Sequence, residues 1–286
     1  MNFRIKKAAL TDIGAKKRVN QDAILVRAAK SRRFGPICFA LVCDGLGGLA
    51  LGEVASSAFK KRMDRWFVND IPPLIRRAEK ENFDSMHCLH RVRLMWQSIF
   101  MEMNESIARY GHGQGIRLGT TAVAFLLIGQ QYLVMHVGDS RLYLTGDNRL
   151  LHLTHDHSLV QKQLDAGILT PSQAGISDKK SILLQCIGAS HVVRPDFRTG
   201  TICQDTSVLL CSDGFWRRLH DEEILDGIRI NQCLSETEMQ RVLRRLTSSV
   251  KQRGERDNIS AILLCLYAEV TIPVLPAFHV GTAAVC

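Results

Sequence analysis

Long apolar runs are absent from this 286-residue chain. Its N-terminus has no apolar core of the kind that a signal peptide needs, so we do not expect export by that route. The most apolar stretch, residues 121–137, is broken by a Gly-Gln-Gln turn at 129–131, whereas a membrane helix needs about 20 uninterrupted apolar residues. That stretch is therefore predicted to be two strands around a tight turn, and no membrane partner is expected.

Aromatic residues are scarce, at 6% of the chain, and 21 Gly with 7 Pro are too few for collagen-like or low-complexity sequence. Basic residues outnumber acidic ones, 37 to 28, which favours an acidic or phosphorylated partner. The basic clusters at 16–18, 30–33 and 60–62 are not interleaved with aromatic residues. They are typical of solvated loops and helix faces, so no nucleic-acid partner is expected.

Paired cysteine motifs are also lacking. The nine cysteines include no C-x-x-C, their number is odd, and most lie inside apolar, strand-like runs. This pattern predicts reduced, buried thiols in a cytoplasmic protein.

The chain alternates between strand-like and helical patterns. Strand-like runs lie at 37–43, 121–128, 132–137, 141–145, 207–211 and 259–267, and helical periodicity appears at 53–67 and 86–107. Ser235 and Glu238 form a capping-box pattern that opens a further helix. Two long helices between early strands, more strands and then late helices predict α+β layers rather than βαβ units.

Four aspartates stand where an apolar strand meets a turn, namely Asp44, Asp139, Asp213 and Asp257. A carboxylate beside an apolar strand is costly unless something pairs with it. One such aspartate alone would be read as a turn residue that caps its own backbone. Four of them can gather at one edge of a sheet, where they would repel one another.

Clustered carboxylates suit hard divalent cations such as Mg²⁺ or Mn²⁺. The glycines after Asp44, in Asp44-Gly45-Leu46-Gly47-Gly48, would let backbone carbonyls approach the same ion. A hydrolytic site of the two-metal kind follows as a hypothesis.

The order of short motifs resembles the metal-dependent Ser/Thr protein phosphatases of the protein phosphatase 2C type, over residues 8–268. The matching motifs are Asn20-Gln21-Asp22, Asp44-Gly45-Leu46-Gly47-Gly48, Gly119-Thr120-Thr121, Val137-Gly138-Asp139-Ser140-Arg141, Leu153-Thr154-His155-Asp156-His157-Ser158, Ser212-Asp213-Gly214 and Asp257-Asn258. The compact length resembles the bacterial branch of the family.

The resemblance implies a four-layer α-β-β-α sandwich in which two antiparallel sheets are flanked by helix pairs. It implies a single catalytic domain over residues 1–270, with a flap at about 159–190 beside the site. Residues 271–286, which contain two prolines, are expected to form a loosely attached tail.

The resemblance also implies the site. Asp44 would bridge two Mn²⁺ or Mg²⁺ ions, the carbonyl of Gly45 would bind one of them, and Asp213 and Asp257 would hold the other. Asp22 would bind metal-bound waters, and Asp139 with Asp213 would support a third, weaker ion. The implied reaction is hydrolysis of phosphoserine or phosphothreonine by attack of a metal-bridging hydroxide.

Three positions depart from the family pattern. Gln21 stands where a glutamate is usual, which would weaken one ion. The phosphate-binding arginine is replaced by Lys17, with Arg18 next to it, so either could hold phosphate and Arg18 is slightly preferred. Leu46 replaces the histidine of eukaryotic relatives, so the leaving oxygen would take its proton from metal-bound water.

Two other interpretations compete with this one. His152, His155 and His157 could suggest zinc, but a turn and a helix cap explain them better, because no fourth ligand is evident. A phosphatase fold that binds phosphoprotein without turnover would be favoured by Gln21 and Lys17. Retention of Asp44, Asp213 and Asp257 argues against that decayed site.

The expected partners are phosphorylated proteins, including a Ser/Thr kinase or its substrate. Bacterial signalling or secretion-system control is the expected setting. The protein is expected to act as a cytoplasmic monomer.

Overall fold

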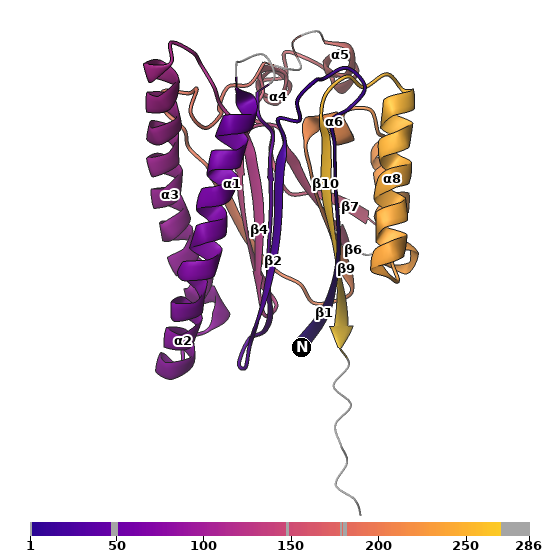
Figure 1. Ribbon diagram of the computed structural model, residues 1–286. Helices are drawn as coiled ribbons and strands as arrows, with labels where there is room; N and C mark the ends of the chain where they lie inside the picture. Colours follow the sequence, from indigo (N-terminus) through magenta and orange to yellow (C-terminus); the bar gives the residue numbers. More distant parts are fainter. Residues whose placement is uncertain (1, 47–50, 147–148, 178, 180–181, 270–286) are drawn as a thin grey trace, which may run out of the picture.

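The computed structural model describes residues 2–46, 51–146, 149–177, 179 and 182–269. In this part of the chain, two antiparallel sheets lie face to face between two layers of helices (Figure 1). The four-layer α-β-β-α sandwich expected from the sequence is confirmed. The predicted tail at 271–286 lies outside the described residues.

Each sheet has five strands, and every pairing between neighbouring strands is antiparallel. The first sheet has the order β1 (Asn2–Asp12), β10 (Ile259–Glu269), β9 (Thr206–Cys211), β6 (Arg141–Gly146), β7 (Arg149–His152). The second has the order β2 (Ala23–Ser31), β3 (Gly35–Cys43), β4 (Ala122–Ile128), β5 (Gln131–Val137), β8 (Asp196–Thr201).

Helices cover the outer face of each sheet (Figure 1). Against the second sheet lie α1 (Gly52–Asn69), α2 (Ile71–Glu81) and α3 (Ser85–Gly113). Against the first lie α6 (Asp213–Trp216), α7 (Asp221–Ile228) and α8 (Glu236–Gln252), with the 3₁₀ turn η1 (Ile230–Gln232) between the last two. The segment expected to form the flap contains α4 (Leu159–Asp165) and α5 (Pro171–Ile176). No helix in the described part of the chain is long and apolar enough to cross a membrane.

The apolar run at 121–137 forms the hairpin β4–β5, as predicted, with Gly129 at a positive φ of 65° in the turn. All of β4 is buried because its two faces meet different layers. Ala124 and Leu126 face the helices, whereas Val123 and Phe125 face the other sheet. Alternation with period two thus explains a continuous apolar run without a membrane.

The helix predictions are confirmed for α1, α3 and α8. Trp66 of α1 packs edge-on against Trp96 of α3 and Phe39 of β3, with ring centroids 5.2 and 5.5 Å apart. At the start of α8, the Ser235 hydroxyl accepts a hydrogen bond from the Glu238 N–H at 3.1 Å, which satisfies an otherwise unpaired helix N–H.

Cysteines in the described part of the chain form no disulfide with one another. Cys203 is exposed and the other seven are buried, mostly in strands. Cys286 lies outside the described residues.

Candidate active site

The aspartates found at strand ends converge on one cavity of about 670 Å³. Asp44 and Asp139 follow β3 and β5 of one sheet, while Asp213 follows β9 and Asp257 precedes β10 of the other. All four line the cavity. Both sheets of the sandwich therefore contribute carboxylates to the same site.

Backbone contacts hold Asp44 at the end of β3. Its N–H donates to the Thr121 hydroxyl at 3.0 Å, and its carbonyl accepts from the Thr121 N–H at 2.8 Å. Gly45 must be a glycine, because a Cβ there would lie 2.4 Å from the Gly52 carbonyl oxygen and 2.6 Å from that of Gln21. The chain can turn away from Asp44 only with this close approach of backbone to backbone.

Asp22 is not among the residues that line the cavity. One of its oxygens accepts a hydrogen bond from the Ser212 hydroxyl at 2.9 Å, and the other is buried without a hydrogen-bond partner. Burial, with repulsion from Asp213 and Asp257, raises the pKa of Asp22 to about 7.

The carboxylates of the site raise one another's pKa through charge repulsion. Burial raises the pKa of Asp44 well above its usual value, and repulsion from Asp22, Asp213, Asp139 and Asp257 adds to this. Burial likewise raises the pKa of Asp139 and of Asp213, each with a further contribution from neighbouring aspartates. Because these aspartates ionise less readily than isolated ones, their ionised forms need a nearby positive charge to be stable.

The carboxylates fit a divalent cation. They offer only oxygen donors, and Asp213 Oδ1, like Asp22 Oδ1, is buried without a hydrogen-bond partner. In the described part of the chain the aspartate oxygens do not form a trio as compact as that of His136, His157 and Asp196, whose ligand atoms lie within 4.8 Å of one another. Wider spacing suits carboxylates that share ions with water.

Within this trio, His157 has a structural explanation, whereas both ring nitrogens of His136 are buried without a hydrogen-bond partner. His157 Nδ1 accepts a hydrogen bond from the Gly138 N–H at 3.4 Å, which leaves Nε2 protonated to donate to Asp196 at 3.2 Å. A protonated nitrogen has no lone pair for a metal. His152 and His155 bond instead to Thr154 and Asp165, so the three histidines of the zinc interpretation do not converge.

Lys17 reaches the cavity and Arg18 does not. Lys17 lines it and places Nζ 2.8 Å from Asp257 Oδ1, whereas Arg18 is exposed. Two further cations on the wall, Arg117 and Arg217, were missed by the sequence analysis, because neither belongs to a motif that indicates phosphate binding.

Gln21 is turned toward helix α1. Its side-chain N–H donates to Glu53 Oε2 at 3.3 Å, and its backbone N–H donates to the Asn258 side chain at 2.9 Å. Glu53 thus brings a negative charge near the position where the family usually has a glutamate.

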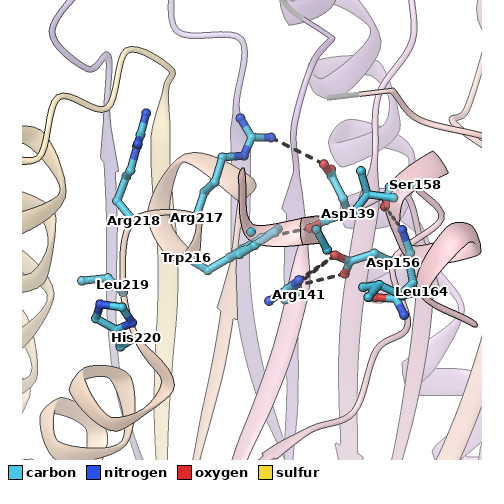
Figure 2. Close-up of a pocket in the computed structure, with 14 residues that line it drawn as sticks. Asp139, Arg141, Asp156, Ser158, Leu164, Trp216, Arg217, Arg218, Leu219 and His220 are labelled. Atoms are coloured by element: carbon cyan, nitrogen blue, oxygen red, sulfur yellow. Dashed lines mark hydrogen bonds and ion pairs between the residues drawn. The ribbon is translucent and has the colours of Figure 1, made fainter. Parts of the chain in front are cut away.

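Arg217 and Trp216 tie α6 to the end of β5. Figure 2 shows the Arg217 guanidinium directed at the Asp139 carboxylate, 3.8 Å away, and it also forms an ion pair with Asp213. The Trp216 indole N–H donates to the Asp139 carbonyl at 3.0 Å, and Arg141 stacks on the Trp216 ring. Asp139 and Arg217 line both the carboxylate cavity and a second cavity of about 370 Å³, which Figure 2 shows with Arg141 and Trp216 on its wall.

Cys211 has the spacing of a thiol-phosphatase nucleophile, six residues before Arg217. It is fully buried at the end of β9, and burial raises the pKa of its thiol far above the ordinary range. A buried, protonated thiol is inert, so the spacing carries no catalytic meaning here.

The segment expected to form the flap continues into one wall of the carboxylate cavity. Ser158 caps α4 by accepting from the Gln161 N–H at 3.1 Å, in agreement with the predicted helix cap. The chain that follows α5 then returns over the site and lines the cavity with Leu183, Leu184, Cys186, Ala189, Ser190, His191 and Val192.

Comparison with solved structures identifies the class of fold. The serine/threonine phosphatase of S. agalactiae superposes with a TM-score of 0.73 at 26% identity, over 93% of this chain and 100% of that one. The catalytic domain of the phosphatase PstP, solved with 2 manganese ions, gives 0.71 at 25% identity over 92% and 99%. The sandwich is that of bacterial serine/threonine phosphatases.

Sequence comparison gives the family. A family model described as Protein phosphatase 2C matches residues 14–263. The protein phosphatase PhpP of Streptococcus pneumoniae is 29% identical over 263 residues, which cover 91% of this chain and 97% of PhpP. The chain belongs to the protein phosphatase 2C family, and the resemblance seen in the motifs is confirmed.

Proposed function

We propose that this chain hydrolyses phosphoserine and phosphothreonine in proteins, at the cavity lined by Asp44, Asp213 and Asp257. The observation that carries the proposal is the convergence of these carboxylates from both sheets, with Lys17 at their edge. Relatives named as serine/threonine phosphatases support the choice of substrate.

Different residues of the site would bind the metal ions and the phosphate. Asp44, with the Gly45 carbonyl, and Asp213 and Asp257 would hold Mn²⁺ or Mg²⁺, while Asp22 would orient metal-bound water. When bound, the ions supply an activated water as nucleophile and neutralise charge on the phosphoryl group. Lys17, at the edge of the cavity beside Asp257, would hold a phosphoryl oxygen when Asp257 binds an ion instead.

Charge also favours a phosphorylated protein as substrate. Five of the 28 acidic residues belong to this one site. Because the chain has 37 Lys and Arg, the rest of it carries a large excess of positive charge. Such a surface attracts an anionic segment toward the cavity. By this account the protein opposes a Ser/Thr kinase, as a monomer in the reducing cytoplasm, while secretion-system control stays a prediction.

The substrate class can be tested with three peptides of one sequence that carry phosphothreonine, phosphoserine or phosphotyrosine. With Mn²⁺ we expect phosphate release from the first two and at least about tenfold less from the third, where the bulky ring holds the phosphate at a different reach. Equal turnover of all three would contradict the proposed class. Tight binding without phosphate release would indicate a phosphatase fold that binds phosphoprotein without turnover.

A further inference from the structure

Asp139 and Asp213 face one cation that belongs to the chain itself. The Arg217 guanidinium forms an ion pair with Asp213 Oδ2 and lies 3.8 Å from Asp139 Oδ2. The side chains of the three residues are 17%, 11% and 6% exposed for Arg217, Asp213 and Asp139 respectively. The three charges stabilise one another, because each would otherwise be buried without water or an opposite charge.

The fold delivers Arg217 to this place. Arg217 caps α6, and its backbone N–H donates to the Asp213 carbonyl at 2.9 Å, so one helical turn sets the two side chains side by side. The neighbouring Trp216 is fixed by its hydrogen bond to the Asp139 carbonyl and by Arg141 stacked 3.3 Å from its ring centroid. These contacts fix the residue that precedes Arg217, and the Arg217 guanidinium itself is held by its ion pairs with Asp213 and Asp139.

Other cations near Asp139 are already committed. Arg141 binds Asp156 through a two-pronged ion pair, with contacts from 2.7 to 3.2 Å. Lys17 is engaged with Asp257 on another part of the wall. Arg217 is therefore the side chain positioned to neutralise Asp139, and a guanidinium keeps its charge at any working pH.

We infer that Arg217 takes the place of a cation between Asp139 and Asp213, so that these two carboxylates hold no divalent ion of their own. Asp213 keeps its other oxygen, Oδ1, which is buried and unpartnered, for an ion shared with Asp257. Asp139 then acts as a positioning residue for Arg217. The third, weaker ion expected from the sequence is replaced by a permanent positive charge.

The inference rests on the proposed function, since it assumes that Asp44, Asp213 and Asp257 bind metal. It predicts a difference in ion count, which does not depend on turnover. A site with three divalent ions would place a third one where the guanidinium stands, and the two charges would repel each other strongly in a buried cavity.

The test counts Mn²⁺ bound to metal-stripped protein, from the EPR signal of free Mn²⁺ and by calorimetric titration. We expect the wild type to bind two ions, as in a two-metal site, and Arg217→Met to bind one more with weaker affinity. The double variant Arg217→Met/Asp139→Asn should lose that additional ion. Arg217→Lys, which keeps the charge, and the half-exposed neighbour Arg218→Met should both bind as the wild type does.

The outcomes separate the inference from the function on which it rests. A wild type that binds three ions, or an Arg217→Met variant whose ion count is unchanged while circular dichroism shows it folded, would overturn the inference and leave the phosphatase site intact. A wild type that binds no Mn²⁺ would overturn the proposed metal site itself.

Discussion

Asp44 experiences more repulsion than an isolated strand-end carboxylate does. Burial raises its pKa first, and the charges of Asp22, Asp213, Asp139 and Asp257 raise it further. Ionisation of Asp44 is therefore unfavourable in the metal-free protein, and a bound cation would offset the repulsion between the carboxylates.

Asp44→Asn should abolish most of the activity and leave the fold intact. We expect a loss of at least about 10²-fold in kcat, because a charge that organises the reacting centre is removed. Stability of the metal-free protein at pH 8 should be equal or higher, since one source of repulsion is gone. Phosphate release and thermal unfolding measure the two effects.

The matched control for this variant is Asp64→Asn, which removes a carboxylate of α1 paired with Arg27 at the surface, 2.7 Å away. Its activity should stay within twofold of the wild type, as is usual for an exposed ion pair. Activity of Asp44→Asn within a few-fold of the wild type would show that Asp44 binds no essential metal.

Lys17 and Arg18 can be separated by their effects on substrate binding. Lys17→Ala should raise KM for a phosphopeptide by about tenfold or more, because a charge-assisted hydrogen bond is lost. Arg18→Ala should change KM by less than twofold, since this side chain is exposed outside the cavity. The reverse ranking in steady-state kinetics would assign the phosphate to Arg18.

Sequence reasoning identified the aspartates but not their neighbours. Asp44, Asp139, Asp213 and Asp257 each stand at the end of an apolar run, and that signal is visible without a structure. Arg217 carries no such signal, because its role depends on the one-turn helix that aims it at Asp139. The choice between Lys17 and Arg18 depends on how the loop before β2 turns, which composition does not reveal.

Among the elements, the one-turn helix α6 has the strongest influence on the site. It begins at Asp213 and is followed by Arg217, so both members of the buried ion pair come from five consecutive residues. Gly214 lets this turn approach the start of β10, because a Cβ there would lie 2.1 Å from the Asn258 carbonyl oxygen. The distance between Asp213 and Asp257 depends on that approach.

Gly214→Ala should therefore move α6 away from β10. We expect a loss of about 1–3 kcal/mol in the free energy of unfolding, as for overpacking in a core, together with weaker Mn²⁺ binding. Denaturant unfolding and calorimetric titration measure these. Gly113→Ala, at the end of α3 where a Cβ meets nothing within 4 Å, is the control and should be neutral or slightly stabilising.

The central strands were predictable, whereas β1 and α2 were not. The apolar runs of β3, β4 and β9 are buried on both faces and show this in the sequence. β1 is an edge strand that pairs only with β10 and carries Lys6 and Lys7 at its middle, which hides the strand pattern. The α2 segment opens with two prolines, which read as a break although the first turn of a helix accepts them.

At the scale of the whole molecule, the paired sheets bring acidic groups together at one end of the sandwich. The free energy of unfolding of the metal-free protein should therefore depend on pH. The pKa of Asp22 is raised from 3.8 to about 7, and those of Asp44, Asp139 and Asp213 are raised too. A folded state that binds protons more tightly than the unfolded chain loses stability as pH rises through the folded pKa. This contribution is complete below about pH 4 and is lost by about pH 7 or above.

Mn²⁺ should reverse that loss. At a fixed concentration equal to 100 times the Kd at pH 8, Mn²⁺ should add about 2.7 kcal/mol at that pH, or roughly 5–10 °C in Tm. The same concentration should add less at pH 5.5, because the ligands must be deprotonated and Kd is therefore higher. Thermal unfolding with Mn²⁺ and with EDTA at both pH values checks this. A gain that is equal or larger at pH 5.5 would mean that the aspartates are not the ligands.

The proposed phosphatase activity depends on divalent ions held by the aspartates that gather at one end of the sandwich. Its most direct test is phosphate release from a phosphothreonine peptide by metal-stripped protein during titration with Mn²⁺. We expect no turnover in EDTA and a saturable rise with Mn²⁺ that is absent in Asp44→Asn. Turnover that persists in EDTA, or folded wild-type protein that stays inactive with both Mn²⁺ and Mg²⁺, would contradict it.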